Sequence, residues 1–394
     1  MTTSRISPAD EVESRPPVVL TDEARELHAS TLLIDGHNDL PWEIRKQARG
    51  QFDKLDISKP QKSLQTDIPR LREGGVGAQF WSVWVPGETA KRGEALSTTI
   101  EQIELVKAMI AQYPETFQLA LTANEIEPIA KQGKIASLIG VEGGYSIEES
   151  IPVLRQLYEM GARYMTLTHS DSLAWANSCT DEPRCEGLSE FGEEVVREMN
   201  RLGMMVDISH VSPDTMKAVL KITKAPVIFS HSSAKAVADH PRNVPDDVLK
   251  LTAENGGVVM VNFFSAFIVP ESAERDVKRM AYRRELDKTM TDEGEIEQAM
   301  RRWDAENGRG EAGTIHTLVD HIDHIVKVAG VDHVGIGSDY DGVTMLPEQL
   351  EDVSAYPYIT QALLDRGYSH DDVKKISGGN LLRVMRATEK AAGK

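Results

Sequence analysis

The amino-acid sequence predicts an α/β protein, a (β/α)8 TIM barrel, on the basis of three observations. Eight short apolar segments recur along the chain, helical patterns separate most of them, and residue types that can perform chemistry directly follow the apolar segments. Alternating strands and helices are typical of a parallel sheet that is covered by helices. Eight such repeats favour a closed barrel over an open sheet, and 394 residues suffice for one barrel with insertions.

The expected strands are rich in β-branched or aromatic residues and are bounded by glycine, proline or polar residues. Each is almost continuously apolar, which is the pattern of a strand buried on both faces. They span residues 32–35, 78–85, 136–142, 162–169, 204–210, 225–231, 257–264 and 333–342.

Helices are expected between these strands, and several carry recognisable start and stop signals. They begin with Ser-x-x-Glu, Ser-Pro-Asp or Pro-Asp-Asp and end in glycine. The clearest helical patterns fall within residues 95–112 and at 149–161, 188–203, 212–223 and 244–256.

The chain is expected to form one catalytic domain. Residues 1–30 are interpreted as a flexible tail that runs into a short helix, and residues 31–394 as a single barrel. The regular alternation is interrupted between the seventh and eighth strands by the highly charged segment 271–310. This segment is expected to form a helical insertion over the barrel mouth, and a disordered linker is the alternative.

Composition and charge exclude several classes of protein. The formal net charge of −18 argues against a nucleic-acid binder and against attraction to anionic lipid. No apolar run has the length of a membrane span, the first 30 residues lack a signal-peptide core, and the C-terminal residues lack an anchor tail. We therefore expect a cytoplasmic protein. Cys179 and Cys185 have no usual zinc spacing and are expected to be ordinary thiols.

Potential catalytic residues gather at the ends of the expected strands, where the active site of such a barrel lies. Six of the eight strands are followed or ended by histidine or carboxylate side chains. These are His37 and Asp39 after the first, Glu142 after the third, His169 after the fourth, His210 after the fifth, His231 after the sixth, and Asp339 and Asp341 after the eighth.

The same residue types predict a two-metal site. His37 and Asp39 are two residues apart, so on an extended backbone both side chains point the same way and can bind one ion. His210 and His231 can hold a second ion, and the two oxygens of Glu142 can bridge both. Imidazole and carboxylate ligands suit zinc, although manganese or iron would accept the same set.

The remaining histidines and the tryptophans are expected to be structural. No metal role is expected for His28, His240, His333 or His370. The other three, His316, His321 and His324, are expected to lie around a surface helix. Trp81 and Trp84 are expected to fill the core.

Six long motifs stand out along the chain: IDGHNDLPW, GVEGG, LTHSDSLAWA, GLSEFGEEVVREMNRLGMMVDISHVS, SHSSAKAVADHPRNVPDD and GIGSDYDG. These motifs resemble those of the membrane (renal-type) dipeptidase family, which includes soluble microbial enzymes. The similarity runs from about residue 30 to about residue 388, with the motifs in the family's order. The chain lacks the disulfide pattern of the animal members.

The resemblance implies a zinc-dependent dipeptidase that forms a homodimer, and it assigns roles to individual residues. It implies that Glu142 bridges two zinc ions, one bound by His37 and Asp39 and the other by His210 and His231. By the same resemblance, the substrate-polarising histidine is His169, the residue that holds the substrate's terminal carboxylate is Arg242, and the proton carrier is Asp339 rather than Asp341.

The implied reaction is hydrolysis of a dipeptide with a free C-terminal carboxylate by a hydroxide that bridges the two zinc ions. A related alternative is the deacylation of N-acyl amino acids, which needs the same metals and a similar carboxylate clamp. A non-catalytic binding protein on the same barrel is the alternative from a different class.

Overall fold

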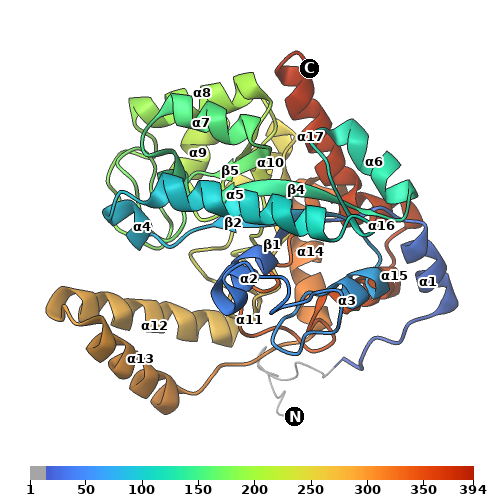
Figure 1. Cartoon of the computed structure of the whole chain (residues 1–394). Helices are drawn as coiled ribbons and strands as arrows, with labels where there is room; N and C mark the ends of the chain where they lie inside the picture. Colours follow the sequence, from blue (N-terminus) through green and yellow to red (C-terminus); the bar gives the residue numbers. More distant parts are fainter. Residues whose placement is uncertain (1–14) are drawn as a thin grey trace, which may run out of the picture.

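Eight parallel strands close into a barrel in the computed structural model, which describes residues 15–394 (Figure 1). Strand β2 pairs with both β1 and β4, and β1 pairs with β9, so the ring has no open edge. The barrel strands are β1 (Leu33–Asn38), β2 (Val76–Trp84), β4 (Ile135–Glu142), β5 (Ala162–Thr166), β6 (Met205–Asp207), β7 (Ile228–Phe229), β8 (Val258–Val261) and β9 (Val334–Ile336). The predicted fold class and all eight expected strands are confirmed.

A ninth strand, β3 (Phe117–Leu119), was not expected from the sequence. It pairs with the first three residues of β4, whereas β5 pairs with β4 only from Ile139 onward. The short β3 therefore extends the sheet outside the ring, at the end of the barrel opposite the strand C-termini. Its side chains are buried, exposed and half-buried in turn, so it lacks the apolar run that marks the other strands.

The five expected helices are present as α5 (Ala95–Gln112), α7 (Ile151–Glu159), α8 (Glu190–Leu202), α9 (Pro213–Ile222) and α10 (Asp246–Asn255). Their ends follow the sequence signals. The Ser189 side chain accepts a hydrogen bond from the Gly192 N–H at the start of α8, and Gly203 ends that helix with a φ of 73°. Ser212 caps α9 in the same way.

None of the helices in the described residues is both long and apolar enough to cross a bilayer. The remaining helices complete the outer layer and the two ends of the barrel. These remaining helices are α1 (Asp22–Ala29), α2 (Leu40–Ala48), α3 (Ile68–Glu73), α4 (Glu88–Lys91), α6 (Ala123–Lys131), α11 (Ser265–Ile268), α14 (Ile315–Ala329), α15 (Tyr356–Asp365), α16 (His370–Lys374) and α17 (Asn380–Ala391), with short helical turns at Gly144–Ile147, Val331–His333, Val353–Ala355 and Lys375–Gly379.

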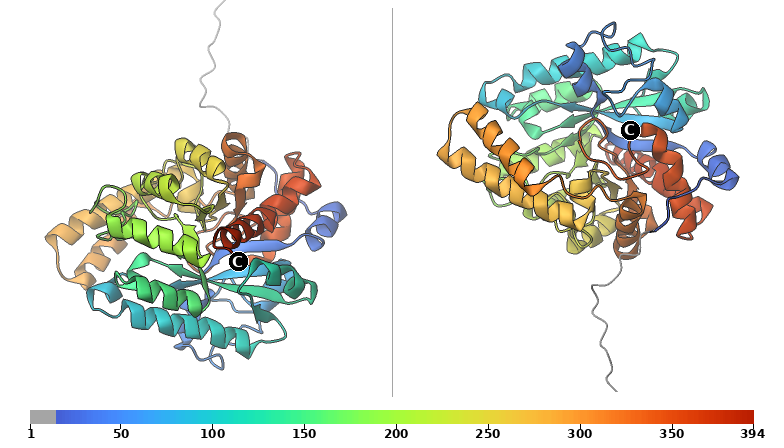
Figure 2. Two further views of the ribbon diagram at one scale, coloured as in Figure 1. Left: turned by 90° about the horizontal axis from the view of Figure 1, so that it is seen from above. Right: turned by 90° about the horizontal axis from the view of Figure 1, so that it is seen from below.

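The charged segment between β8 and β9 forms two helices, α12 (Pro270–Thr289) and α13 (Glu293–Asn307). They project from one side of the barrel in each view (Figures 1 and 2). Asp304 of α13 forms ion pairs with Arg275 and Arg279 of α12, which join the two helices near their connection to the barrel. The charge of this segment therefore pairs largely within the segment itself.

Two structural expectations are wrong. His321 does not lie on the surface of α14 but is fully buried, where its Nδ1 accepts from the Ala234 N–H and its Nε2 donates to the Ile268 carbonyl. It shares the apolar face of α14 with Leu318 and Ile325, three and four residues away. Trp81 is fully buried as expected, but Trp84 is only half-buried and lines a cavity at the barrel mouth.

Two backbone segments approach each other closely in the barrel interior, at Gly337 and Ser230. A Cβ atom on Gly337, directly after β9, would lie 1.9 Å from the Ser230 carbonyl oxygen. Gly337→Ala should therefore lower the free energy of unfolding by about 3 kcal/mol, the upper range for overpacking a core. Gly294→Ala in α13, where the new methyl meets only the Asp292 side chain, is the control and should change it by less than about 1 kcal/mol. Equal denaturant midpoints for both variants would contradict this account.

Candidate active site and metal centre

The histidine and carboxylate side chains at the strand ends converge on one cavity of about 400 Å³ at the C-terminal end of the barrel. His37 lies beneath it and is fully buried. The other eight residues singled out in the sequence all line it: Asp39, Glu142, His169, His210, His231, Arg242, Asp339 and Asp341. The cavity also takes residues from the segment that leads into α12 and from α12 itself.

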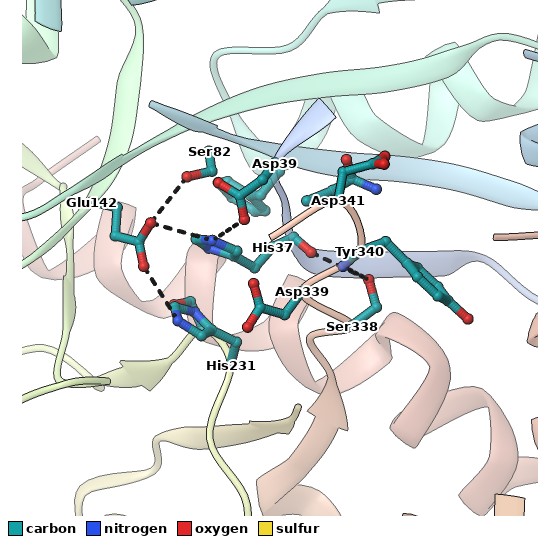
Figure 3. Close-up of polar contacts among 12 residues, drawn as sticks. His37, Asp39, Ser82, Glu142, His231, Ser338, Asp339, Tyr340 and Asp341 are labelled. Carbon is teal, nitrogen blue, oxygen red and sulfur yellow. Dashed lines mark hydrogen bonds and ion pairs between the residues drawn. The ribbon is translucent and has the colours of Figure 1, made fainter. Parts of the chain in front are cut away.

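Glu142, the last residue of β4, is the centre of the cluster (Figure 3). Its Oε1 lies 3.0 Å from His210 Nε2 and 3.3 Å from His231 Nε2. Its Oε2 lies 3.6 Å from His37 Nε2 and accepts a hydrogen bond from Ser82 Oγ at 3.3 Å. The two carboxylate oxygens therefore face different histidines.

The junction of β1 and β9 brings two more ligand-type side chains, Asp39 and Asp339, close to His37. His37 Nε2 lies 3.2 Å from Asp39 Oδ2, and His37, Asp39 and Asp339 each offer an atom within 4.8 Å of the others. The two chain segments are held together by backbone hydrogen bonds from Asp39 N to Tyr340 O and from Asp339 N to His37 O. Asp339 Oδ2 accepts a hydrogen bond from Asn262 at 2.8 Å.

Asp339 and Asp341 differ in the residues that they contact. Asp341 accepts a hydrogen bond from the Gln65 N–H and donates its own N–H to the Gln65 side chain, and Figure 3 shows its carboxylate turned away from Glu142. Asp339 instead belongs to the His37 cluster. The geometry therefore favours Asp339 for contact with reacting atoms.

Three residues of the site have a backbone conformation that is unusual for residues other than glycine. His210, Asp339 and Asp341 have φ angles of 67°, 66° and 65°. Non-glycine residues in this left-handed region cost free energy and are concentrated at functional sites. The surrounding structure thus holds these side chains at the cavity despite a local energetic cost.

Outer hydrogen bonds orient two of the histidines. Tyr164 donates its hydroxyl to the Gly36 carbonyl, so the same oxygen accepts from His37 Nδ1–H at 2.9 Å. Ser230 donates to the buried Asp207 carboxylate, so its oxygen accepts from His231 Nδ1–H at 2.8 Å. Both arrangements place Nδ1–H on the outer acceptor, so that Nε2 faces the cluster, as in metal-binding histidines.

These outer residues were not found by the sequence analysis. Tyr164 lies 127 positions from His37, and a single sequence carries no signal for such a pairing. Asp207 was detectable, because an acidic residue inside the apolar segment 204–210 needs a polar partner when that segment is buried.

The site's electrostatics favour bound positive charge. Burial alone raises the pKa of Glu142, but the facing histidines His37, His210 and His231 hold it well below its usual value. Burial keeps the pKa of His210 and His231 well below the ordinary value for imidazole, so both are neutral. Burial and the neighbouring carboxylates of Asp39 and Glu142 raise the pKa of Asp339 to about 8, with His37 opposing the shift.

The donor set fits a metal centre. His210 Nε2 and His231 Nε2 are 2.8 Å apart, and His37 Nε2 is buried without a hydrogen-bond partner among the described residues. Imidazole nitrogens that converge beside a carboxylate in this way suit a cation bound between them. Ligand atoms within 4.8 Å of one another are offered by three sets: His37, Glu142 and His231; Glu142, His169 and His210; and His37, Asp39 and Asp339.

His169 and Arg242 lie around this cluster. His169 Nε2 is 3.9 Å from Glu142 Oε1, and its side chain is 24% exposed, so it can reach a bound molecule. Arg242 is buried, and its guanidinium donates to the His231 carbonyl and to Ser232 Oγ, both neutral oxygens. Among residues 15–394 it forms no ion pair with a carboxylate, so its charge is left for an anion in the cavity.

The other candidates have structural roles. Cys179 and Cys185 are free thiols, and the Cys179 N–H donates to the His210 carbonyl. His28 is buried and contacts the Gly74 carbonyl and Thr360. Within the described residues, none of the histidines expected to be structural belongs to a group that could hold a metal.

Comparisons with known proteins support the motif resemblance. A family model described as membrane dipeptidase (peptidase family M19) matches residues 21–394. The probable dipeptidase PvdM from Pseudomonas aeruginosa has a similar structure with a TM-score of 0.81. The two share 26% identity, with 94% of this chain and 98% of that chain covered.

Two other solved structures share the fold. One is an amidohydrolase from Pseudomonas aeruginosa, at 24% identity and a TM-score of 0.71, covering 93% of this chain and 98% of its own. The other is a metallo peptidase from Rhodobacter sphaeroides liganded with a phosphinate mimic of the dipeptide L-Ala-D-Ala. It has 23% identity and a TM-score of 0.74, and covers 91% of this chain and 100% of its own. With the family match over nearly its whole length, the chain belongs to the membrane dipeptidase family, peptidase family M19, and is a hydrolase of peptide bonds.

Proposed function

We propose that this protein hydrolyses dipeptides that carry a free C-terminal carboxylate, at a centre of two zinc ions. The observation that carries the proposal is the presence of two complementary features in one cavity. The cluster around Glu142 can hold the metals and activate water, and the buried Arg242 leaves a cation for a carboxylate.

We assign one zinc ion to His37 and Asp39 and the other to His210 and His231, with Glu142 between them. The two oxygens of Glu142 face His37 on one side and the His210 and His231 pair on the other, which supports a bridging role. When bound, such a pair would activate water for attack at neutral pH and would polarise the substrate carbonyl. Manganese or iron would fit the same donors.

The chain's own residues then perform the remaining steps. His169 lies at the exposed side of the cluster and donates a hydrogen bond to the carbonyl oxygen as negative charge develops there, a contribution of typically ~3 kcal/mol. Asp339 is fixed through Oδ2 by Asn262, and bound metal ions would favour its ionised form, so that Oδ1 can accept a proton from the attacking water. It passes that proton to the leaving amine.

Arg242 accounts for the restriction to dipeptides. A guanidinium binds a carboxylate with two parallel hydrogen bonds, which a lysine ammonium cannot reproduce. A longer peptide would present a neutral amide at this position. N-acyl amino acids also carry a suitable carboxylate, so deacylation is the alternative, and parallel assays of dipeptides and N-acyl amino acids distinguish the two.

The outer hydrogen bond to His37 should matter for metal affinity. Tyr164→Phe removes the acceptor of His37 Nδ1–H and should lower zinc affinity about 10- to 100-fold, the usual effect of losing an outer partner of a ligand histidine. Titration against a competing chelator measures it. Tyr145→Phe is the control, because that buried hydroxyl donates only to the Val85 carbonyl. Equal losses in both variants would show that Tyr164 acts through packing alone.

The two neighbouring aspartates should behave differently. Asp339→Asn keeps the shape of the side chain but cannot accept the proton, so kcat should fall about 10²- to 10⁴-fold with unchanged metal content. Asp341→Asn retains an oxygen for the Gln65 N–H and should keep kcat near the wild-type value. The reverse pattern would assign proton transfer to Asp341.

The carboxylate clamp can be tested by a cycle of two enzymes and two substrates. Two single changes each remove one partner of a buried charge pair: Arg242→Ala assayed on a free dipeptide, and the wild-type enzyme assayed on the C-terminal amide. Each should lower kcat/KM by an amount that corresponds to about 2–5 kcal/mol of lost transition-state stabilisation. The double change should cost little more than either single change. Additive losses would mean that Arg242 does not hold the carboxylate.

A further inference from the structure

The segment that leads into the charged insertion forms part of the cavity wall. Phe264 directly precedes α11, and Phe267 belongs to it. Asp276 and Met280 lie in α12. All four side chains line the cavity that contains Arg242. The base of this segment is fixed to the barrel. Its backbone carbonyls at Phe267 and Ile268 accept hydrogen bonds from Asn243 and His321.

His240 connects this wall to Arg242. Its side chain is fully buried, and its Nδ1 accepts a hydrogen bond from the Arg242 backbone N–H at 3.1 Å. Burial lowers the pKa of His240, so the ring is neutral and carries its single proton on Nε2. That nitrogen lies 3.3 Å from Asp276 Oδ2 of α12. The Asp276 carboxylate therefore favours the tautomer that leaves Nδ1 free to accept from Arg242.

Phe267 provides a second contact with the same pair. Its ring centroid lies 4.6 Å from that of His240, at an angle of 33°, and 5.3 Å from the central guanidinium carbon of Arg242. His240 is thus held by a ring face on one side and by Asp276 at its edge. Arg242 therefore contacts both Phe267 and His240, and His240 contacts Asp276 of the insertion.

We propose that Asp276 is a positioning residue that orients the Arg242 clamp through His240, so that the insertion sets the affinity for the substrate's C-terminal carboxylate. The proposal rests on the proposed role of Arg242. Without Asp276, the imidazole loses the contact that selects its tautomer and can rotate about its Cβ–Cγ bond. The Arg242 N–H then loses its acceptor, and the guanidinium leaves the position from which it binds a carboxylate.

The test compares Asp276→Ala with Glu274→Ala. Both remove a carboxylate from α12, but Glu274 pairs with Lys278 on the exposed side of the helix. Asp276→Ala should raise KM for a free dipeptide about tenfold, the lower end of the effect of losing an outer-shell hydrogen-bond partner. Its kcat, zinc content and melting temperature should stay at wild-type values. Asp276→Asn keeps an oxygen for His240 Nε2–H and should recover most of the KM, and Glu274→Ala should change none of these quantities.

A second measurement separates positioning from a general effect on the cavity. The C-terminal amide of the dipeptide is used as a competitive inhibitor, which reports its binding whether or not it is cleaved. Asp276→Ala should leave the inhibition constant of the amide unchanged, because the amide lacks the carboxylate. An equal loss for dipeptide and amide, or an unchanged KM for the dipeptide, would overturn the proposal.

The same assay on Arg242→Ala distinguishes failure of this inference from failure of the proposed function. If Arg242→Ala weakens the dipeptide but not the amide, and Asp276→Ala does neither, only the positioning role is wrong. If neither variant discriminates between the two compounds, the clamp itself is wrong and the positioning role fails with it. In the Arg242→Ala background, Asp276→Ala should have no further effect on KM, and an added loss would also contradict the proposal.

Discussion

The ionised carboxylate of Glu142, buried at the end of a barrel strand, is the constraint around which the site is organised. A buried charge is costly unless other groups compensate it. Three histidine nitrogens, contributed by β1 and by the segments after β6 and β7, face its two oxygens. Two of these histidines are oriented from behind, His37 by the hydroxyl of Tyr164 and His231 by that of Ser230. The polar interior thus extends from the cavity toward the centre of the barrel.

The sequence was most informative where one physical rule acts on contiguous residues. Buried parallel strands carry apolar runs, so all eight barrel strands were predicted, whereas the three-residue β3 was missed because its side chains alternate in burial. The rule that parallel strands end at one face of a barrel predicts that His37, Glu142 and Asp339 lie in one region. In the structure, His37 shares one group of ligand atoms with Glu142 and another with Asp339.

The sequence was less informative where a residue's environment depends on distant parts of the chain. His321 lies at the spacing of the apolar face of α14. Its buried ring nitrogens form hydrogen bonds with the backbone of Ala234 and Ile268, which lie far away in the sequence. Trp84 ends an otherwise buried strand and turns into the cavity. The contacts from Asp276 through His240 to Arg242 join the insertion to the barrel, and no local sequence pattern predicts them.

The junction of β1 and β9 has a consequence for biosynthesis. These strands meet at the pair Asp35 and Ile336, and the buried Asp35 carboxylate accepts hydrogen bonds from the backbone and side chain of Ser338, 303 positions later. A ribosome therefore releases His37 and Asp39 long before it makes the strand that completes their surroundings. Closing so long a stretch of chain is a late step in folding. The nascent chain consequently lacks the group formed by His37, Asp39 and Asp339 until the last strand of the barrel has been made.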